Sequence, residues 1–247
     1  MSDLHLTRDG LPIWGEDTRQ KLECAIELIK KIQNIDVILV SGDISNDGSW
    51  ESYEFADNVF SQTGIPTYWC LGNHDNLDLL KPSSSLKYCK LSDISELCGW
   101  NIILLNSVTK DDDVPGQNRS RGIIDSQTIT ELYEIVNGID KPTIVVLHHP
   151  ALEIGGWQDK KILKNRESFR KILESSKNVR IVLSGHVHEF SDTTLNGIRY
   201  STATGLGFAF SGKTPNYKLS AGSEGFSEIT IKGDKIFINN ILLDNNK

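Results

Sequence analysis

Short apolar runs alternate with amphipathic segments along most of the chain. Where apolar residues recur every three or four positions, as at Leu22, Ile26 and Ile29, the pattern predicts a helix with one buried face. Short runs of β-branched and apolar residues predict buried strands. The predicted helices span residues 17–32, 49–62, 125–136 and 165–174. The predicted strands span residues 37–41, 66–71, 101–106, 143–147, 179–183, 198–203, 226–231 and 235–242.

The order of these elements predicts the fold class. From residue 37 to residue 188, a buried strand is repeatedly followed by a polar motif and often by a helix, which is typical of an α/β protein with its site at one sheet edge. Residues 76–99 and 111–121 are polar stretches without a clear period. No linker, composition shift or internal repeat divides the sequence, so we predict one domain spanning residues 1–247.

Composition excludes some classes of partner. The chain has 247 residues with 26 Lys plus Arg and 33 Asp plus Glu, and a net charge of −7 disfavours non-specific binding to nucleic acid or to an anionic membrane. Of the four cysteines, Cys24 lies in a predicted helix and Cys70 in a predicted strand, so we expect both to be small buried residues. No membrane-length apolar run or signal peptide is present, and we expect a reduced, cytoplasmic protein.

The histidines carry the candidate chemistry. All six fall in four short motifs, each of which also holds Asp, Asn, Gly or Pro, and a fifth segment, Gly42-Asp43, follows an apolar run in the same way. The four motifs are Asp3-Leu4-His5, Gly72-Asn73-His74-Asp75, His148-His149-Pro150 and Gly185-His186-Val187-His188. Imidazole nitrogens and carboxylate or amide oxygens are common metal ligands, so the pattern predicts a metal site of mixed donors.

The number and spacing of donors favour two metal ions. Seven candidate ligands are too many for one tetrahedral zinc and suit two ions that share a carboxylate. Residues two apart in extended backbone place their side chains on one face, so Asp3 with His5, and His186 with His188, can each reach one site. The candidate ligands are Asp3, His5, Asp43, Asn73, His148, His186 and His188.

In this order, the five motifs resemble the calcineurin-like metallophosphoesterases, over residues 3–188. The resemblance implies a two-sheet β-sandwich flanked by helices, in four layers. It also implies that Asp3, His5 and His188 bind one divalent ion, that Asn73, His148 and His186 bind the other, and that Asp43 bridges them. The ligand types suit Mn, Fe or Zn.

The same resemblance implies the catalytic residues. His74 would not bind metal but would donate a proton to the leaving oxygen or stabilise its charge. An acidic partner would orient it, and Asp75 or Asp47 can fill that role. The family often has Asp three residues after the bridging Asp, whereas this chain has Asn46 there, which leaves the partner of His74 open.

Within the family, the chain is most similar to the bacterial class III cyclic-nucleotide phosphodiesterases. The reaction implied is hydrolysis of cyclic AMP, a small molecule, to a 5′-monophosphate by a hydroxide that bridges the metals. We expect the substrate to contact Asn73, His74, His149, Trp157 and Asn165. His149 can instead support a neighbouring ligand, Trp157 can be core, and Asn165 can cap its helix. The alternatives are a glycerophosphodiesterase or a scaffold without activity, and a homodimer is possible.

One departure from the family concerns the start of the sequence. The family has an apolar strand before Asp-x-His, whereas this sequence starts at Met1-Ser2-Asp3. Either the stated start is internal to the natural gene, or the strand is absent. In the second case we expect Asp3 and His5 to be weakly anchored, and activity and stability to be lower than in a version that carries the strand.

Overall fold

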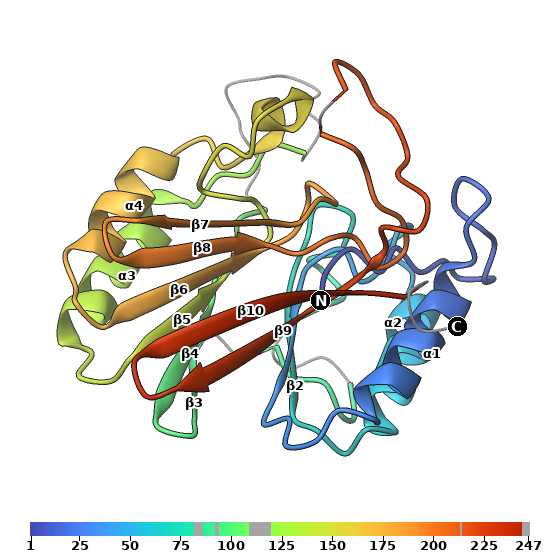
Figure 1. The fold of residues 1–247 in the computed structure, drawn as a ribbon, viewed down its shortest axis with the longest axis horizontal. Coiled ribbons are helices and arrows are strands. Elements are labelled where there is room, and N and C mark those ends of the chain that lie inside the picture. The colour runs from blue at the N-terminus through green and yellow to red at the C-terminus, as the bar shows by residue number, and fades with distance from the viewer. Residues whose placement is uncertain (82–85, 92–93, 109–119, 213, 244–247) are drawn as a thin grey trace.

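The computed structural model describes residues 1–81, 86–91, 94–108, 120–212 and 214–243, and these residues form three sheets arranged in two β layers that pack face to face (Figure 1). The helices are α1 (Thr18–Ile29), α2 (Trp50–Ser61), α3 (Ser126–Gly138), α4 (Arg166–Glu174) and the short 3₁₀ helix η1 (Trp157–Lys161). The strands are β1 (Ile38–Ser41), β2 (Thr67–Cys70), β3 (Ile94–Leu97), β4 (Trp100–Leu104), β5 (Thr143–Val146), β6 (Val179–Ser184), β7 (Ser191–Leu195), β8 (Ile198–Thr202), β9 (Gly225–Lys232) and β10 (Lys235–Leu242).

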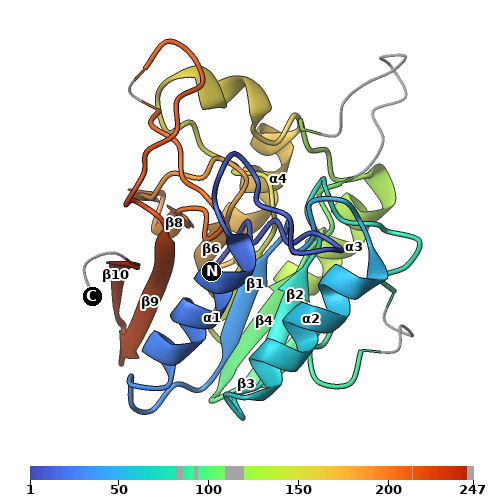
Figure 2. The same ribbon diagram turned by 90° about the vertical axis from the view of Figure 1, so that its right-hand side faces the viewer.

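One layer is a six-stranded sheet in the order β3-β4-β5-β6-β8-β7. Its four central strands are parallel, and both edge strands pair antiparallel to their neighbours. The facing layer holds the parallel pair β1-β2 and the antiparallel hairpin β9-β10. Helices α1 and α2 cover the outer side of the β1-β2 layer, and α3 and α4 cover the outer side of the large sheet (Figure 2).

Three apolar clusters hold these four layers together. The first joins α1 and α2 to β1, with Trp69 of β2 and Phe60 of α2 among its largest buried side chains. The second joins α3 and α4 to the large sheet. The third lies between the sheets and includes Tyr68, Ile144 and Ile181. The predicted four-layer sandwich is therefore confirmed, because both faces of the central strands are covered by apolar side chains.

Most predicted elements form within a few residues of their expected ends. The Asp17 carboxylate accepts a hydrogen bond from the Gln20 backbone N–H and starts α1 as predicted. Strands β3 and β7 and helix η1 were not predicted, because they are short and polar. Cys70 is buried as expected, but the expectation for Cys24 was wrong, since it lies on the exposed side of α1. Most of the loop expected at residues 111–121 lies outside the described residues.

The first six residues run beside β1 rather than projecting from the fold. The Met1 ammonium donates to the Leu39 carbonyl, the Met1 carbonyl accepts from Ser41, and Asp3 donates its N–H to the Gly42 carbonyl. On the other side, the carbonyls of Ser2 and Asp3 accept backbone hydrogen bonds from residues 206 and 207. Asp3 and His5 are thus held on both sides, and the structure does not show the weakly anchored terminus that we considered.

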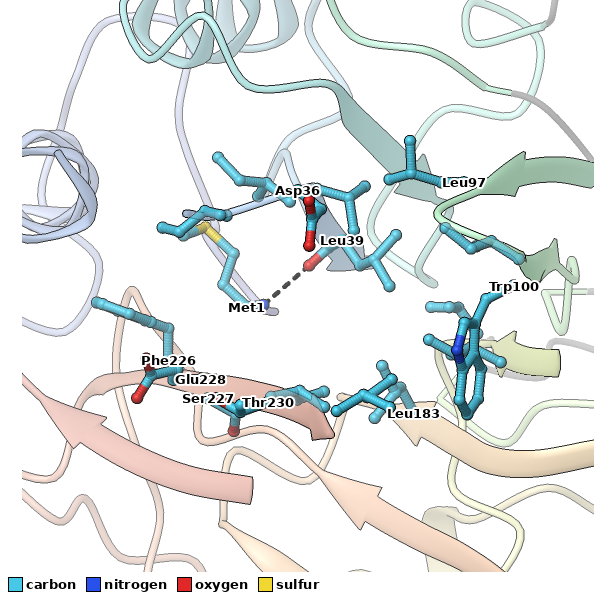
Figure 3. Close-up of a pocket in the computed structure, with 18 of the residues that line it drawn as sticks. Met1, Asp36, Leu39, Leu97, Trp100, Leu183, Phe226, Ser227, Glu228 and Thr230 are labelled. Carbon is cyan, nitrogen blue, oxygen red and sulfur yellow. Dashed lines mark hydrogen bonds between the residues drawn. The ribbon is translucent and has the colours of Figure 1, made fainter. Parts of the chain in front are cut away.

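A largely apolar cleft of about 770 Å³ opens next to Met1, between β1 and β9 (Figure 3). Its walls include Leu39 of β1, Leu183 of β6 and Ile229 of β9. Backbone hydrogen bonds already continue β1 through Met1 at one end of this cleft. A segment fused ahead of Met1 would therefore start beside β1 at the edge of this cleft.

A variant with an apolar strand of about five residues fused ahead of Met1 is expected to have a higher Tm. The added backbone would continue the pairing beside β1, and its side chains would bury apolar surface in the cleft. Thermal unfolding measures the shift, which we expect to be at least several degrees. The matched control is a Gly-Ser extension of equal length, and equal Tm values for the two variants would contradict the expectation.

Candidate metal centre

The candidate ligands meet at one end of the sandwich. β1 and β2 are parallel to each other, and so are β5 and β6, and the carboxyl end of each of these strands leads into one histidine or aspartate motif. The His148 Nδ1, after β5, lies 2.8 Å from the carbonyl oxygen of Ser41 at the end of β1. This contact joins the ligand-bearing ends of the two sheets, as predicted for a site at a sheet edge.

The first donor group contains Asp3, His5 and His188. The His188 Nε2 lies 3.2 Å from an Asp3 carboxylate oxygen and 3.2 Å from the His5 Nε2. The His5 Nε2 lies 3.9 Å from the same carboxylate oxygen. All three side chains are buried, and their donor atoms lie within 4.8 Å of one another.

The second donor group lies beside the first. The His148 Nε2 is 3.1 Å from the Asn73 Oδ1 and 3.1 Å from the His186 Nδ1. One Asp43 carboxylate oxygen lies 3.4 Å from the His148 Nε2 and 3.6 Å from the His5 Nε2. Asp43 therefore stands between the two groups, where a carboxylate shared by two ions would have to be.

Each of the four ligand histidines uses its other ring nitrogen to bond an oxygen outside the centre. The pairs are His5 with the Asn46 side chain, His148 with the Ser41 carbonyl, His186 with the Ser120 carbonyl and His188 with the Phe208 carbonyl. A ring nitrogen that donates to oxygen leaves the opposite nitrogen with a lone pair. The outer contacts thus direct the other ring nitrogen of each histidine toward the centre, where its lone pair becomes available once that nitrogen is deprotonated.

The donor set fits divalent metal ions. The Asp3 Oδ1 is fully buried, and no described residue gives it a hydrogen bond. The Nε2 atoms of His5 and His188 lie 3.9 Å and 3.2 Å from it and 3.2 Å from each other, so three potential acceptors crowd around one point. Such an arrangement of acceptors costs free energy unless a cation binds among them.

Five of the candidate ligands have a left-handed backbone. Their φ angles lie between 49° and 70°, a region that side chains other than Gly, Asn and Asp rarely adopt. These residues are Asp3, His5, Asp43, His186 and His188. At each of these positions the backbone turns sharply, and this directs the side chain into the centre. Backbone strain of this kind is common where function fixes the position of a side chain.

Gly72 shows how closely the two loops approach. A Cβ at Gly72 would lie 2.2 Å from the Asp43 Oδ1 and 2.2 Å from the Asp43 backbone nitrogen. Only a residue without a side chain therefore fits beside the shared carboxylate.

Gly72→Ala is expected to lower metal affinity at least tenfold, because the added methyl group must displace Asp43 from between the two donor groups. Titration of the metal-free protein with Mn²⁺ measures the change. Gly138→Ala, at the end of α3 where a Cβ would meet nothing within 4 Å, is the matched control. Equal Mn²⁺ affinities for Gly72→Ala and Gly138→Ala would contradict this expectation, because they would show that the loop accommodates the methyl group without displacing Asp43.

Burial and charge set the protonation of the centre in the absence of metal. Burial lowers the pKa of His5 to about 3, against the opposing effect of Asp43, and it lowers the pKa of His186 well below its usual value. Burial also acts to lower the pKa of His148, but the Asp43 carboxylate outweighs it and raises that pKa to about 9. Burial opposes ionisation of Asp3, yet His188 lowers the pKa of that carboxyl to about 2. His5 and His186 are therefore neutral near pH 7.

The metal-free protein is expected to lose stability as pH falls below about 6.5. The unfolded chain binds protons on His5 from pH 6.5 downward, whereas the folded chain does not until about pH 3. The stabilising contribution is thus complete above pH 6.5 and decreases by about 1.4 kcal/mol per pH unit below it for one such residue. Urea unfolding of the chelator-treated protein and of its His5→Gln variant between pH 6.5 and pH 5 measures this slope as the difference between the two, because Asp75 titrates in the same range with the opposite sign. A His5→Gln variant with the same slope would contradict the assignment.

His74 lies at the rim of the centre and is exposed. Its Nδ1 is 3.2 Å from the Asn46 carbonyl oxygen, and its ring meets the His5 ring edge-on at 4.8 Å. Its backbone N–H donates to the Asp43 carboxylate, so the same turn positions the shared carboxylate and the exposed imidazole. The ring is thus near both donor groups while one side remains open to a ligand.

Asp75 and Asp47 were the two candidates for an acidic partner of the His74 ring, and the contacts described for both are with other groups. Asp75 is fully buried and accepts backbone N–H groups of Ile44, Ser45 and Gly72, so it ties together the turns that carry Asp43 and Asn73. Burial, with the Asp43 charge, raises the pKa of Asp75 to about 7. Asp47 accepts from Ser45, Ser49 and the backbone of Arg8. The contact observed for the His74 ring is instead a backbone carbonyl.

Of the remaining residues predicted to contact substrate, some line the pocket above the centre and others do not. Trp157 lines the pocket above the centre, together with Asn73 and His74. His149 is fully buried, bonds Ser107 and packs on His186 with ring centroids 4.4 Å apart. Asn165 bonds the backbone N–H and carbonyl of residue 124 and gives α4 no side-chain cap. Neither is among the residues that line this pocket, so a substrate contact for them remains a prediction.

The pocket above the centre measures about 350 Å³, and several of its residues were not predicted. Trp14, Lys161, Phe208, Phe210 and Tyr217 come from two loops and from the end of η1, and they line it together with candidate ligands. No motif joins these positions in the sequence. The Trp14-Gly15 pair, a large aromatic residue next to a turn residue, was the one local signal that pointed to an exposed ring.

Known proteins resemble this chain over most of its length. The family model for calcineurin-like phosphoesterases matches residues 1–190. A 3′,5′-cyclic-nucleotide phosphodiesterase of Nostoc sp. is 25% identical over 241 residues, which cover 95% of this chain and 87% of that protein. The 3′,5′-cyclic adenosine monophosphate phosphodiesterase CpdA of Vibrio vulnificus is 29% identical over 238 residues, covering 94% of this chain and 84% of that protein.

Solved structures confirm the fold. A dimetal phosphatase from Danio rerio superposes with a TM-score of 0.72 at 15% identity, covering 97% of this chain and 94% of that one. GAP50, named as the anchor in the inner membrane complex of Plasmodium, superposes with a TM-score of 0.68 at 15% identity, covering 98% and 84%. Among the described residues, no helix is long and apolar enough to cross a membrane. With its ligand motifs converging on one centre and the family model covering residues 1–190, the chain belongs to the calcineurin-like phosphoesterase family.

Proposed function

We propose that this protein is a metal-dependent phosphodiesterase that hydrolyses 3′,5′-cyclic nucleotides, cyclic AMP first among them, to 5′-monophosphates. The observation that carries the proposal is the position of Asp43 between two groups of buried donors, with the exposed His74 beside it. Two ions at such a centre neutralise the charge of a phosphoryl group and acidify bound water. The two cyclic-nucleotide phosphodiesterases to which this chain is similar, at 25% and 29% identity, support the substrate class.

In this reaction, different residues of the chain would bind the metal ions, position His74 and transfer a proton. Asp3, His5 and His188 would hold one ion, and Asn73, His148 and His186 the other. Asp43 would bind both and, through its bond to the His74 backbone, would fix the position of that ring. His74 would hold a proton at its pocket-facing nitrogen and deliver it to the departing 3′ oxygen. The pocket walls would keep bulk water from the reacting phosphorus.

Two other functions compete with this one. A glycerophosphodiesterase would use the same centre with a different pocket wall. A scaffold without activity is also possible on this fold, and one structural neighbour carries the name of an anchor protein. The presence of seven candidate donors and His74 around one centre favours an enzyme over a scaffold, because a scaffold has no need to bury so many metal-binding groups together.

The test is turnover by protein that has been stripped with a chelator and reloaded with Mn²⁺. Cyclic AMP, bis(p-nitrophenyl) phosphate and glycerophosphocholine are offered in parallel, and the chelated protein is the control. We expect cyclic AMP hydrolysis to AMP that appears only with metal. Hydrolysis of glycerophosphocholine alone would favour the glycerophosphodiesterase. No hydrolysis of any diester by protein that holds two ions would contradict an enzymatic role.

A further inference from the structure

The wall of the pocket above the centre contains a continuous series of aromatic rings. Phe208 stacks on His5 and His188, with ring centroids 4.7 Å and 4.5 Å apart. Trp14 stacks on Phe208 at 5.2 Å, and Tyr217 meets Trp14 at 4.7 Å. The series begins at the metal ligands and leads outward, so a ligand whose phosphate lies at the centre has its remaining part beside these rings.

Two of these rings are unusually exposed. Trp14 is 48% exposed and Tyr217 is 49% exposed, whereas large apolar side chains that stabilise a core are buried. Both line the pocket rather than an unrelated surface. Aromatic faces that remain open at a pocket wall are available to stack on a planar ligand.

Trp14 also has a strained backbone. Its φ is 55°, in the left-handed region, which a bulky residue rarely occupies. Gly15 follows at φ 86°, and residues 13 and 16 pair across the turn, so the loop holds the indole ring in place. A glycine or an asparagine would form this turn with less strain. The position of the ring over the pocket, rather than the stability of the turn, accounts for a tryptophan here.

Lys161 adds a positive charge to the same wall. Its ammonium lies 5.3 Å from the Trp157 ring centroid and 5.9 Å from that of Tyr217. Among the described residues, no carboxylate lies within 4 Å of this ammonium, although the side chain is half-buried. Burial lowers its pKa, and its charge contributes to lowering the pKa of His186 at the centre. A half-buried cation without an anion partner beside a phosphate site suits an anionic ligand.

The wall contains one further unsatisfied group. Gln158 is 1% exposed and lines the pocket, and its Nε2 donates to Glu189. Its Oε1 is buried, and no described residue gives it a hydrogen bond. A buried acceptor of this kind ordinarily finds a partner in water or ligand. The wall therefore offers stacking surface, a cation and an acceptor.

We propose that Trp14 and Tyr217 stack on the nucleobase of the substrate and that Lys161 contacts its anionic phosphoryl oxygens. This inference rests on the proposed function and narrows it: the pocket wall selects nucleotides over phosphodiesters that lack a planar base. A glycerophosphodiester gives the rings nothing to stack on, so the wall favours the cyclic-nucleotide activity over the glycerophosphodiesterase.

The experiment compares ligands that differ only in the base. Binding of AMP and of ribose 5-phosphate to Mn²⁺-loaded protein is measured by calorimetry, and KM is measured for cyclic AMP and for ribose 3,5-cyclic phosphate. Trp14→Ala is expected to weaken AMP binding about tenfold to a hundredfold, the usual effect of one lost base stack, and to leave ribose 5-phosphate within about twofold. Lys161→Gln is expected to weaken both ligands alike.

Three further variants separate recognition from folding. Trp14→Phe keeps a ring and is expected to retain most of the AMP affinity, and Tyr217→Ala provides a second loss of stacking. Tyr133→Ala removes an equally exposed ring from α3 and is expected to change nothing. Equal effects of Trp14→Ala on ligands with and without a base would overturn the inference.

The same measurements separate the inference from the proposed function. If no diester is hydrolysed but AMP binding depends on Trp14, the nucleobase site stands and the hydrolase proposal fails. If cyclic AMP and the base-free cyclic phosphate are hydrolysed with the same KM, the hydrolase proposal stands and the nucleobase site fails.

Discussion

Asp43→Asn is expected to lower kcat for phosphodiester hydrolysis by about 10³-fold or more. The substitution keeps the side-chain shape, and its oxygen can still accept the His74 backbone N–H. The other oxygen, which lies 3.4 Å and 3.6 Å from His148 and His5, becomes an amide nitrogen that cannot bind a cation. Metal analysis of the dialysed variant is expected to find fewer than two ions per chain.

A buried carboxylate elsewhere is the matched control. Asp57 accepts the backbone N–H groups of Lys87, Tyr88 and Cys89 and has no contact with the centre. Asp57→Asn is expected to cost about 1–3 kcal/mol of stability and to leave the metal content of the folded protein unchanged. Asp43→Asn is expected to show the opposite result for metal content, because its folded chains are expected to hold fewer than two ions each. Full metal content and near-normal turnover in Asp43→Asn would rule out a shared ligand at this position.

His74→Ala is expected to lower kcat for cyclic AMP by about 10²- to 10⁴-fold, the usual contribution of a positioned proton donor. The ring is exposed and lies at the pocket rim, so Tm and metal content are expected to remain unchanged. The loss is expected to be smaller for bis(p-nitrophenyl) phosphate, because p-nitrophenolate leaves without needing a proton. Steady-state kinetics on the two substrates measure the difference.

Other results for His74→Ala would assign the ring a different role. A loss of bound metal would make it a ligand, which its distance from Asp43 and His5 allows. An equal loss on both substrates with metal retained would indicate that the ring stabilises the charge of the phosphoryl group rather than protonating the leaving oxygen.

Five of the seven candidate donors were predictable because each follows a strand whose end is marked by the end of an apolar run, whereas Asp3 and His5 were predicted from their spacing alone. Parallel strands end at the same edge, so sequence order alone brings Asp43, Asn73, His148 and His186 together. The helices were predictable for a similar reason, since each has one apolar stripe. Strand β7 was missed because its residues Ser191–Leu195 are mostly polar and lie at a sheet edge, where alternation with a buried face is absent.

The walls of the site were not predictable from the same patterns. Trp14, Lys161 and Tyr217 lie far apart in sequence, on two loops and at the end of η1, and only the folded chain brings them together. The role of Asp75 was also missed. Its position beside His74 in the sequence suggested a partnership, whereas the turn directs its carboxylate inward to three backbone N–H groups. Local turn geometry, which sequence spacing does not specify, determines where such a side chain points.

The left-handed backbone at five candidate ligands has a consequence for directed evolution of this protein. Each such residue costs about 1–2 kcal/mol relative to a glycine at the same place. A library screened for heat resistance alone would therefore enrich glycine or asparagine at positions such as His5 and His188. The selected variants would have a higher Tm but no catalytic activity. Screening for thermostable variants has to retain a selection for turnover, because the positions that limit stability are the ones that form the metal centre.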